Sequence, residues 1–274
     1  MIHETEPTIG ASPAGESNAA ETKAKAAQKQ RDELESRFYK NCPQADPYIR
    51  KAERSSTPRP AQHSLVMKWP EFDCVDLLTD EHWEFGGPVV LPGLLLHGAS
   101  GSGKTTSAYL AIRESFGCWY PADRQMPGVV AVGAVEMGRT ISELARSGGD
   151  EFQAYLDRLA YCGLLFIDDL DKARFTPRVE SELFDLLEFR AVEDRAVVVT
   201  TNLKGRELER MFSRHIGPAI VNRLRRICIP IDFDEPEFDA EAALAAVQAK
   251  IRADYVPQAE ASRAYHLGGK AEQR

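Results

Sequence analysis

The chain has 274 residues, of which 43% are hydrophobic, so its length and apolar content predict one principal domain with extensions. Its formal net charge of −8 excludes a uniformly basic nucleic-acid coat protein, and any contact with DNA or RNA needs a local basic patch. The chain has five cysteines without a C-x-x-C pair, which predicts reduced thiols: Cys42, Cys74, Cys118, Cys162 and Cys228. Neither a signal region nor an apolar run of bilayer length occurs, which predicts a cytoplasmic protein with no membrane partner.

The N-terminal part predicts a tail followed by a helical extension. Residues 1–18 are poor in apolar side chains and are expected to be disordered. Residues 19–60 are predicted to form a helical extension and linker, in which residues 19–40 favour a helix and residues 55–60 a proline-containing linker. The aromatic side chains Phe38, Tyr39 and Tyr48 make this extension either a solvated helix or a docking helix for a partner, and we favour docking because exposed aromatics are costly.

The main domain is expected to span residues 61–235. Its first part carries four aromatic residues among acidic ones. These side chains either contact a nucleotide base or serve as ordinary packing, and packing is the more common role: Trp69, Phe72, Trp83 and Phe85.

A phosphate-binding loop follows. Leu94–His97 is an apolar run typical of a buried strand, and Thr106–Phe116 reads as a helix. The residues between them fit the pattern G-x-x-x-x-G-K-[ST], in which glycines let backbone N–H groups approach phosphates. Lys104 supplies a charge for the β- and γ-phosphates, and Thr105 offers its hydroxyl to Mg²⁺. The predicted nucleotide-binding residues are Gly98, Ala99, Ser100, Gly101, Ser102, Gly103, Lys104, Thr105 and Thr106.

Strand and helix patterns then alternate. Short apolar runs predict strands over residues 129–132, 163–167, 196–199 and 227–233. Helices are expected over residues 141–146, 151–159, 177–192 and 220–224. This alternation predicts an α/β fold of the P-loop NTPase type, with a parallel sheet between helices on both faces. Ligands of such sheets bind beyond the carboxyl ends of the strands, where Asp168 and Asn202 fall.

Paired acids follow the third of these strands. Asp168 is suited to holding the water shell of Mg²⁺, and Asp169 to orienting or polarising an attacking water. Asp171 reads as a solvated loop acid. An Asp-Asp pair alone is common, but about 60 residues after a phosphate loop in an α/β pattern it indicates a metal-nucleotide site.

Asn202 follows the next strand. It either reaches the γ-phosphate or the water, or it caps a turn. The residues that follow it do not match N-K-x-D, so nothing favours guanine, and adenine is the expected base.

Basic residues gather between residues 204 and 226. Arg223 could act in trans on the γ-phosphate of a neighbouring subunit, as arginine fingers do. The others could contact a nucleic-acid backbone, and the alternative for each is a solvated helix face. The cluster contains Lys204, Arg206, Arg210, Arg214, Arg223, Arg225 and Arg226.

Four segments together resemble the AAA+ ATPases of the DnaC/DnaI/IstB helicase-loader group: Gly98–Thr105, Leu164–Asp169, Val197–Asn202 and Ile220–Leu224. The resemblance implies a Walker A motif in the first, Walker B acids at Asp168 and Asp169, sensor 1 at Asn202 and an arginine finger at Arg223. It also implies ATP and Mg²⁺ as cofactors, a homo-oligomer when ATP is bound, and loading of a replicative helicase onto single-stranded DNA through an N-terminal extension.

Two departures from the AAA+ pattern bear on activity. Asp169 stands where AAA+ proteins usually have Glu, so slow hydrolysis is expected. Residues 236–274 offer only one good helix, at residues 238–255, which is too little for a helical lid; loader-type members also lack that lid.

Three other functions remain open from the sequence. The first is an IstB-type transposition helper ATPase, the second a P-loop kinase for a small molecule, and the third an ATP-gated binding module that does not hydrolyse. The position of the basic cluster beside the last strand favours a role at a subunit interface or on DNA over the kinase.

Overall fold

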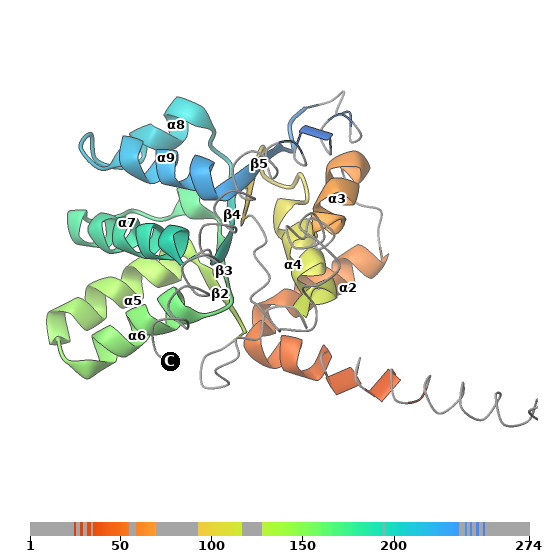
Figure 1. The fold of residues 1–274 in the computed structure, drawn as a ribbon, viewed down its shortest axis with the longest axis horizontal. Coiled ribbons are helices and arrows are strands. Elements are labelled where there is room, and N and C mark those ends of the chain that lie inside the picture. The colour runs from red at the N-terminus through yellow and green to blue at the C-terminus, as the bar shows by residue number, and fades with distance from the viewer. Residues whose placement is uncertain are drawn as a thin grey trace, which may run out of the picture.

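The computed structural model describes residues 35–54, 59–69, 93–116, 128–193 and 195–235, with a few positions between 25 and 33 and between 239 and 249. Its centre is a five-stranded parallel sheet with the order β2-β3-β4-β1-β5 (Figure 1). The strands are β1 (Gly93–His97), β2 (Val129–Gly133), β3 (Leu164–Asp168), β4 (Ala196–Thr201) and β5 (Cys228–Asp232). The predicted α/β P-loop NTPase fold is confirmed.

Helices cover both faces of the sheet (Figure 1). One face carries the 3-10 turn η1 (Pro43–Ala45) and the helices α2 (Asp46–Arg54), α3 (Pro60–Met67) and α4 (Lys104–Glu114). The other carries α5 (Ala134–Ser147), α6 (Asp150–Tyr161), α7 (Pro177–Val192), α8 (Gly205–Arg210) and α9 (Gly217–Ile227). A 3-10 turn, η5 (Leu170–Lys172), follows β3.

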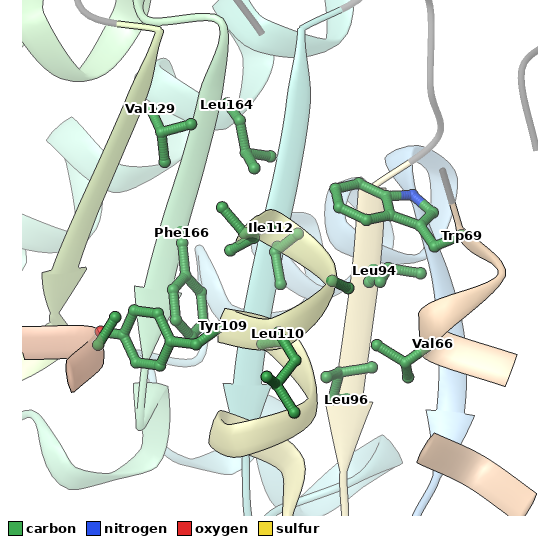
Figure 2. Packing of buried hydrophobic residues seen from close by; sticks show 14 of the residues in the cluster. Val66, Trp69, Leu94, Leu96, Tyr109, Leu110, Ile112, Val129, Leu164 and Phe166 are labelled. Atoms are coloured by element: carbon green, nitrogen blue, oxygen red, sulfur yellow. The ribbon is translucent and has the colours of Figure 1, made fainter. Parts of the chain in front are cut away.

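Alternating side chains of the strands feed two hydrophobic cores. On β1, Leu94 and Leu96 point to the core beneath α4, whereas Leu95 points to the core beneath α5–α9. Both faces are covered, so the strands are apolar along most of their length and carry polar side chains only near their carboxyl ends. Figure 2 shows the first core, where Tyr109 of α4 meets Phe166 of β3 edge-on, with ring centroids 4.9 Å apart.

The N-terminal helices belong to this first core. Phe38, Cys42 and Ile49 are fully buried in the same cluster as β1 and α4. The Phe38 ring packs edge-on against Phe116 at the end of α4, with centroids 5.6 Å apart. Burial of Phe38 is therefore satisfied within the chain, and this residue does not argue for a docking helix. Tyr48 stacks on Tyr109 and keeps 37% of its surface exposed.

Most elements that the sequence predicted are present, and their ends differ where local signals were weak. Helix α7 has the predicted bounds because Thr176 caps it: the Thr176 hydroxyl accepts from the backbone N–H of Val179, and Pro177 follows. Helix α5 begins at Ala134, seven residues before the predicted start at Ile141. The short helices α3 and α8 were not predicted.

Several predictions fall on residues outside the described part. These are the tail at residues 1–18, the aromatic residues Phe72, Trp83 and Phe85, and the C-terminal segment at residues 236–274, apart from a few positions within it. Trp69 is described and is fully buried in the first core, which agrees with a packing role. Among the described residues, no helix is both long and apolar enough to cross a bilayer.

Candidate functional site

The phosphate-binding loop connects β1 to α4 in the strand–loop–helix order that the sequence predicted. Gly98 has a φ of 138°, and a Cβ there would lie 3.0 Å from Phe233 and Asp234, so any other residue would be strained. Gly103 has a φ of 100° and directly precedes the first residue of α4. The loop is thus built to bring backbone N–H groups and the N-terminus of α4 to one point, which is the geometry that binds phosphates.

Lys104 is folded back over this loop. Its ammonium donates to the backbone oxygens of Gly98 at 2.6 Å and Ala99 at 2.8 Å, and to the amide oxygen of Asn202 at 3.1 Å. Burial lowers the pKa of Lys104, while the surrounding carboxylates oppose the shift. The lysine therefore already lies at the mouth of the loop, held by neutral oxygens that a phosphate can replace.

Asp168 ends β3 next to the start of α4. Its Oδ1 accepts a hydrogen bond from the Thr105 hydroxyl at 2.9 Å and another from the Thr200 hydroxyl at 2.5 Å. Burial raises the pKa of Asp168, although both hydroxyl contacts oppose this. A threonine hydroxyl beside a carboxylate is the donor set that fits Mg²⁺, which takes one or two protein oxygens and completes its shell with water and phosphate.

Asp169 has an unusual backbone conformation. With φ 53° and ψ 53°, it is the one residue other than glycine with a positive φ in the described part of the chain. Its backbone N–H donates to the Thr200 hydroxyl oxygen at 2.8 Å. Asp tolerates the left-handed region better than most residues, and such conformations concentrate at functional sites.

Asn202 lies directly after β4 and is held by Asp171. The Asp171 carboxylate accepts from the Asn202 backbone N–H at 2.7 Å and from its side-chain amide at 2.9 Å. Only 8% of the Asp171 side chain is exposed. Burial alone would raise its pKa, but the hydrogen bonds from Asn202 together with the charge of Lys172 outweigh it, and the pKa is lowered. The expectation of a solvated Asp171 is therefore wrong, because Asp171 lies in the turn η5 and its partner Asn202 follows a different strand, β4.

Arg223 lies elsewhere. Its guanidinium forms an ion pair with Glu188 of α7. Helix α7 leads from the carboxyl end of β3 back to the amino end of β4, and Glu188 is near its C-terminus. Arg223 thus faces the opposite end of the sheet from the loop of its own chain.

The remaining basic residues divide into two groups. Lys204 pairs with Asp232 at 2.9 Å and Arg225 with Glu209 at 3.7 Å. Arg206, Arg210 and Arg214 have exposed side chains on and just after α8, and Arg226 is exposed in the last turn of α9.

The structure thus brings most of the predicted site residues to the carboxyl edge of β1, β3 and β4. Of the loop residues, Ala99, Ser100 and Gly101 are exposed at its tip, and Thr106 lies in the first turn of α4. The sequence did not predict two residues of the site, Thr200 and Asp234. The Thr200 hydroxyl donates to Asp168, and the Asp234 carboxylate accepts from the Ala99 N–H at 2.5 Å. The signals for Thr200 and Asp171 were the patterns Thr-Thr-Asn and Asp-Asp-x-Asp; nothing in the sequence points to Asp234.

Residues 94–227 match the family described as ATPase family associated with various cellular activities (AAA). This match confirms the AAA+ resemblance. No curated protein matches the sequence of the chain.

Three solved structures illustrate what the chain is similar to. A structure of DnaI has 21% identity over 55% of this chain and 77% of its own, with a TM-score of 0.45. A structure of the DnaC helicase loader has 17% identity over 54% of this chain and 82% of its own, with a TM-score of 0.41. AMPPCP-bound DnaA from Aquifex aeolicus has 16% identity over 61% of this chain, with a TM-score of 0.42. The chain spans 47% of that DnaA structure.

Proposed function

We propose that this chain, whose residues 94–227 form an AAA-family domain, hydrolyses ATP with Mg²⁺ to load a replicative helicase onto single-stranded DNA. One observation carries the ATPase part of the proposal. Lys104, Asp168 and Asn202 come from three different elements, and short hydrogen bonds join them to the phosphate-binding loop and its Thr105.

The loop and Lys104 bind the phosphates. Backbone N–H groups and the N-terminus of α4 attract the anion, and the Lys104 ammonium exchanges the loop carbonyls for phosphate oxygens. Thr105 and Asp168 would hold the Mg²⁺ ion that accompanies the nucleotide. The Mg²⁺ ion, when bound with ATP, neutralises charge on the β- and γ-phosphates.

Hydrolysis falls to Asp169 and Asn202. In this proposal Asp169 orients the attacking water and accepts its proton, while Asn202 contacts the γ-phosphate or that water. The Asp169 carboxylate is one methylene shorter than the Glu that AAA+ proteins usually place there. We therefore expect a slow turnover, in which the ATP-bound state lasts long enough to act as a signal.

The loading part of the proposal rests on the order of four motifs and on the surface around α8. The phosphate loop, Asp168-Asp169, Asn202 and Val221-Asn222-Arg223-Leu224 follow one another as in helicase loaders. Arg206, Arg210 and Arg214 offer positive charge to a DNA backbone in an otherwise acidic protein. Arg223 would complete the ATP site of a neighbouring subunit, so that ATP couples assembly to DNA binding.

The experiment combines the full chain with the replicative helicase of the same organism and single-stranded DNA coated with single-strand-binding protein. We expect the wild-type chain with ATP to speed helicase-dependent strand displacement, and Lys104→Ala to give no stimulation. Lys68→Ala, which removes an exposed lysine at the end of α3, serves as the matched control.

Each other outcome selects a different function. If the helicase neither binds nor responds while a transposase does, the chain is a transposition helper. Phosphate transfer to a small molecule without any effect of DNA identifies a kinase. ATP binding without phosphate release leaves an ATP-gated binding module.

A further inference from the structure

The Thr200 side chain lies between the two consecutive acids of the site. It is fully buried on β4. Its hydroxyl donates to Asp168 Oδ1 at 2.5 Å and accepts from the backbone N–H of Asp169 at 2.8 Å. One oxygen atom therefore contacts both residues, in the two roles that a hydroxyl can play at once.

The register of the sheet produces this contact. Ile167 of β3 pairs with Val199 of β4, so the next residues along the two strands, Asp168 and Thr200, lie side by side. Beyond this point strands β3 and β4 no longer pair, because the backbone of Asp169 adopts the left-handed conformation. The Asp169 N–H leaves the strand direction there, and the Thr200 oxygen accepts its hydrogen bond.

We propose that Thr200 is a positioning residue that sets the directions of the Asp168 and Asp169 carboxylates toward the metal-bound nucleotide and its attacking water. The inference rests on the proposed ATPase function. It concerns a residue on the neighbouring strand β4 that would act through its hydrogen bonds to Asp168 and Asp169.

Two hydroxyls hold the Asp168 carboxylate, since Thr105 and Thr200 both donate to its Oδ1. The Thr105 hydroxyl is the one that a phosphate-loop site uses as a metal ligand. When it serves that purpose, the hydrogen bond from Thr200 is the one that still fixes the Asp168 carboxylate. Loss of the Thr200 hydroxyl should therefore be felt most when Mg²⁺ is present.

The chain offers a matched pair of threonines for the test. Thr201 is equally buried on the same strand, but its hydroxyl accepts from the backbone N–H of Leu203 and not from the acids. Thr200→Val and Thr201→Val each replace a hydroxyl with a methyl group at nearly constant shape. Thr200→Ser restores the hydroxyl without the methyl group.

The measurement is the affinity of the full-length protein for a fluorescent ATP analogue, titrated with and without Mg²⁺. For Thr200→Val we expect the Mg²⁺ concentration at half-maximal binding to rise about 10- to 100-fold, the usual effect of removing a partner of a metal-ligating carboxylate. Affinity without Mg²⁺ should stay within about twofold of wild type, since the Thr200 hydroxyl forms its hydrogen bonds with Asp168 and Asp169 and not with the backbone of the loop. Thr201→Val and Thr200→Ser should keep the wild-type Mg²⁺ dependence.

Opposite outcomes are equally clear. An unchanged Mg²⁺ dependence in Thr200→Val, or equal losses in Thr200→Val and Thr201→Val, overturns the proposal. If the valine variant does not fold, Thr200→Cys, whose thiol is a weak donor, is compared with Thr200→Ser in the same way. A wild-type protein that binds Mg²⁺-ATP without releasing phosphate contradicts only the proposed hydrolysis, and the titration still decides the role of Thr200.

Discussion

Asn202 accepts a hydrogen bond from Lys104 over 3.1 Å, which joins the end of β4 to the first residue of α4. The amide nitrogen of Asn202 is meanwhile held by Asp171, so its oxygen is the atom left to face the lysine. A phosphate that draws the Lys104 ammonium toward itself consequently changes the surroundings of Asn202. Binding at the loop and the state of β4 are linked through this one contact.

Replacing Lys104 with Ala should lower the affinity for ATP at least tenfold, or by about 1.4 kcal/mol. The reason is the loss of charge-assisted hydrogen bonds to phosphate oxygens. Isothermal titration calorimetry of the full chain measures the effect, with Lys68→Ala as the control. Wild-type affinity in Lys104→Ala would falsify the assignment of the loop.

Replacing Asp171 with Asn should lower kcat about tenfold, because a hydrogen bond to a charged group contributes about 1.5 kcal/mol or more. An Asn side chain has one acceptor oxygen in place of a carboxylate, so it cannot hold both N–H groups of Asn202 as Asp171 does. We expect KM for ATP to change by less than about twofold, since the hydrogen bonds of Asp171 go to Asn202 and not to the loop. Asp185→Asn, at an exposed position on α7, is the control. A matching fall in both variants would mean that Asp171 has no special part.

Replacing Asp168 with Asn should stabilise the nucleotide-free protein while it abolishes Mg²⁺-dependent hydrolysis. Burial raises the pKa of Asp168, so the folded state is destabilised once the carboxyl ionises as the pH rises through that pKa. The amide carries no charge and can still accept from Thr105. Thermal unfolding at pH 7 should show a Tm higher by roughly 3 °C.

The same pKa shift fixes the pH dependence of this gain. Below the ordinary pKa of an aspartate the carboxyl is protonated in both states, and the advantage of Asn should disappear. Melting curves of both proteins between pH 4 and pH 8 test the sign. A gain that grows as the pH falls would contradict the burial argument.

Replacing Arg223 with Ala should leave ATP binding by the monomer intact and lower kcat at least about 100-fold, as loss of an arginine finger does. In the isolated chain this guanidinium is paired with Glu188, so it contacts no phosphate of its own site. Mixing Arg223→Ala with Lys104→Ala subunits should restore part of the activity, because each supplies what the other lacks. Failure of the mixture to recover activity would argue against sites shared between subunits.

Replacing Arg206, Arg210 and Arg214 together with Ala should weaken binding to single-stranded DNA and reduce its salt dependence. Each phosphate contact contributes about 0.7 to the slope of log affinity against log salt, so the slope should fall by about 2. Fluorescence anisotropy over a salt series measures it. The triple replacement of Lys40, Arg54 and Lys68, which are exposed at other places, should leave the slope unchanged.

Much of this fold could be predicted from the sequence because its strands are buried on both faces. Leu164–Ile167 and Val197–Val199 are apolar at every position, which few other structures allow. Helix α8 escaped prediction because its six residues bury only Leu208, which is too little for a periodic pattern. Phe38 looked exposed because its partner Phe116 is far along the chain.

The site divides in the same way. Lys104 and Thr105 belong to a motif whose spacing is local, so the sequence alone places them together. Asp171, in the turn after β3, binds Asn202 at the end of β4, and Thr200 of β4 binds Asp168 of β3. Both contacts depend on the register in which β3 pairs with β4, which periodicity does not reveal. A carboxylate in a loop and a threonine in a strand are both too common to stand out without that register.

Helix α4 starts at the phosphate-binding loop, and helices α2 and α3 pack against it along its length. His63 of α3 contacts Ser107, Tyr48 of α2 stacks on Tyr109, and Glu53 pairs with Arg113. Any movement of α4 on nucleotide binding would therefore act on α2 and α3 directly, through these contacts. Helix α2 belongs to the segment for which the sequence favours partner docking, and it packs directly on the helix that begins at the phosphate-binding loop.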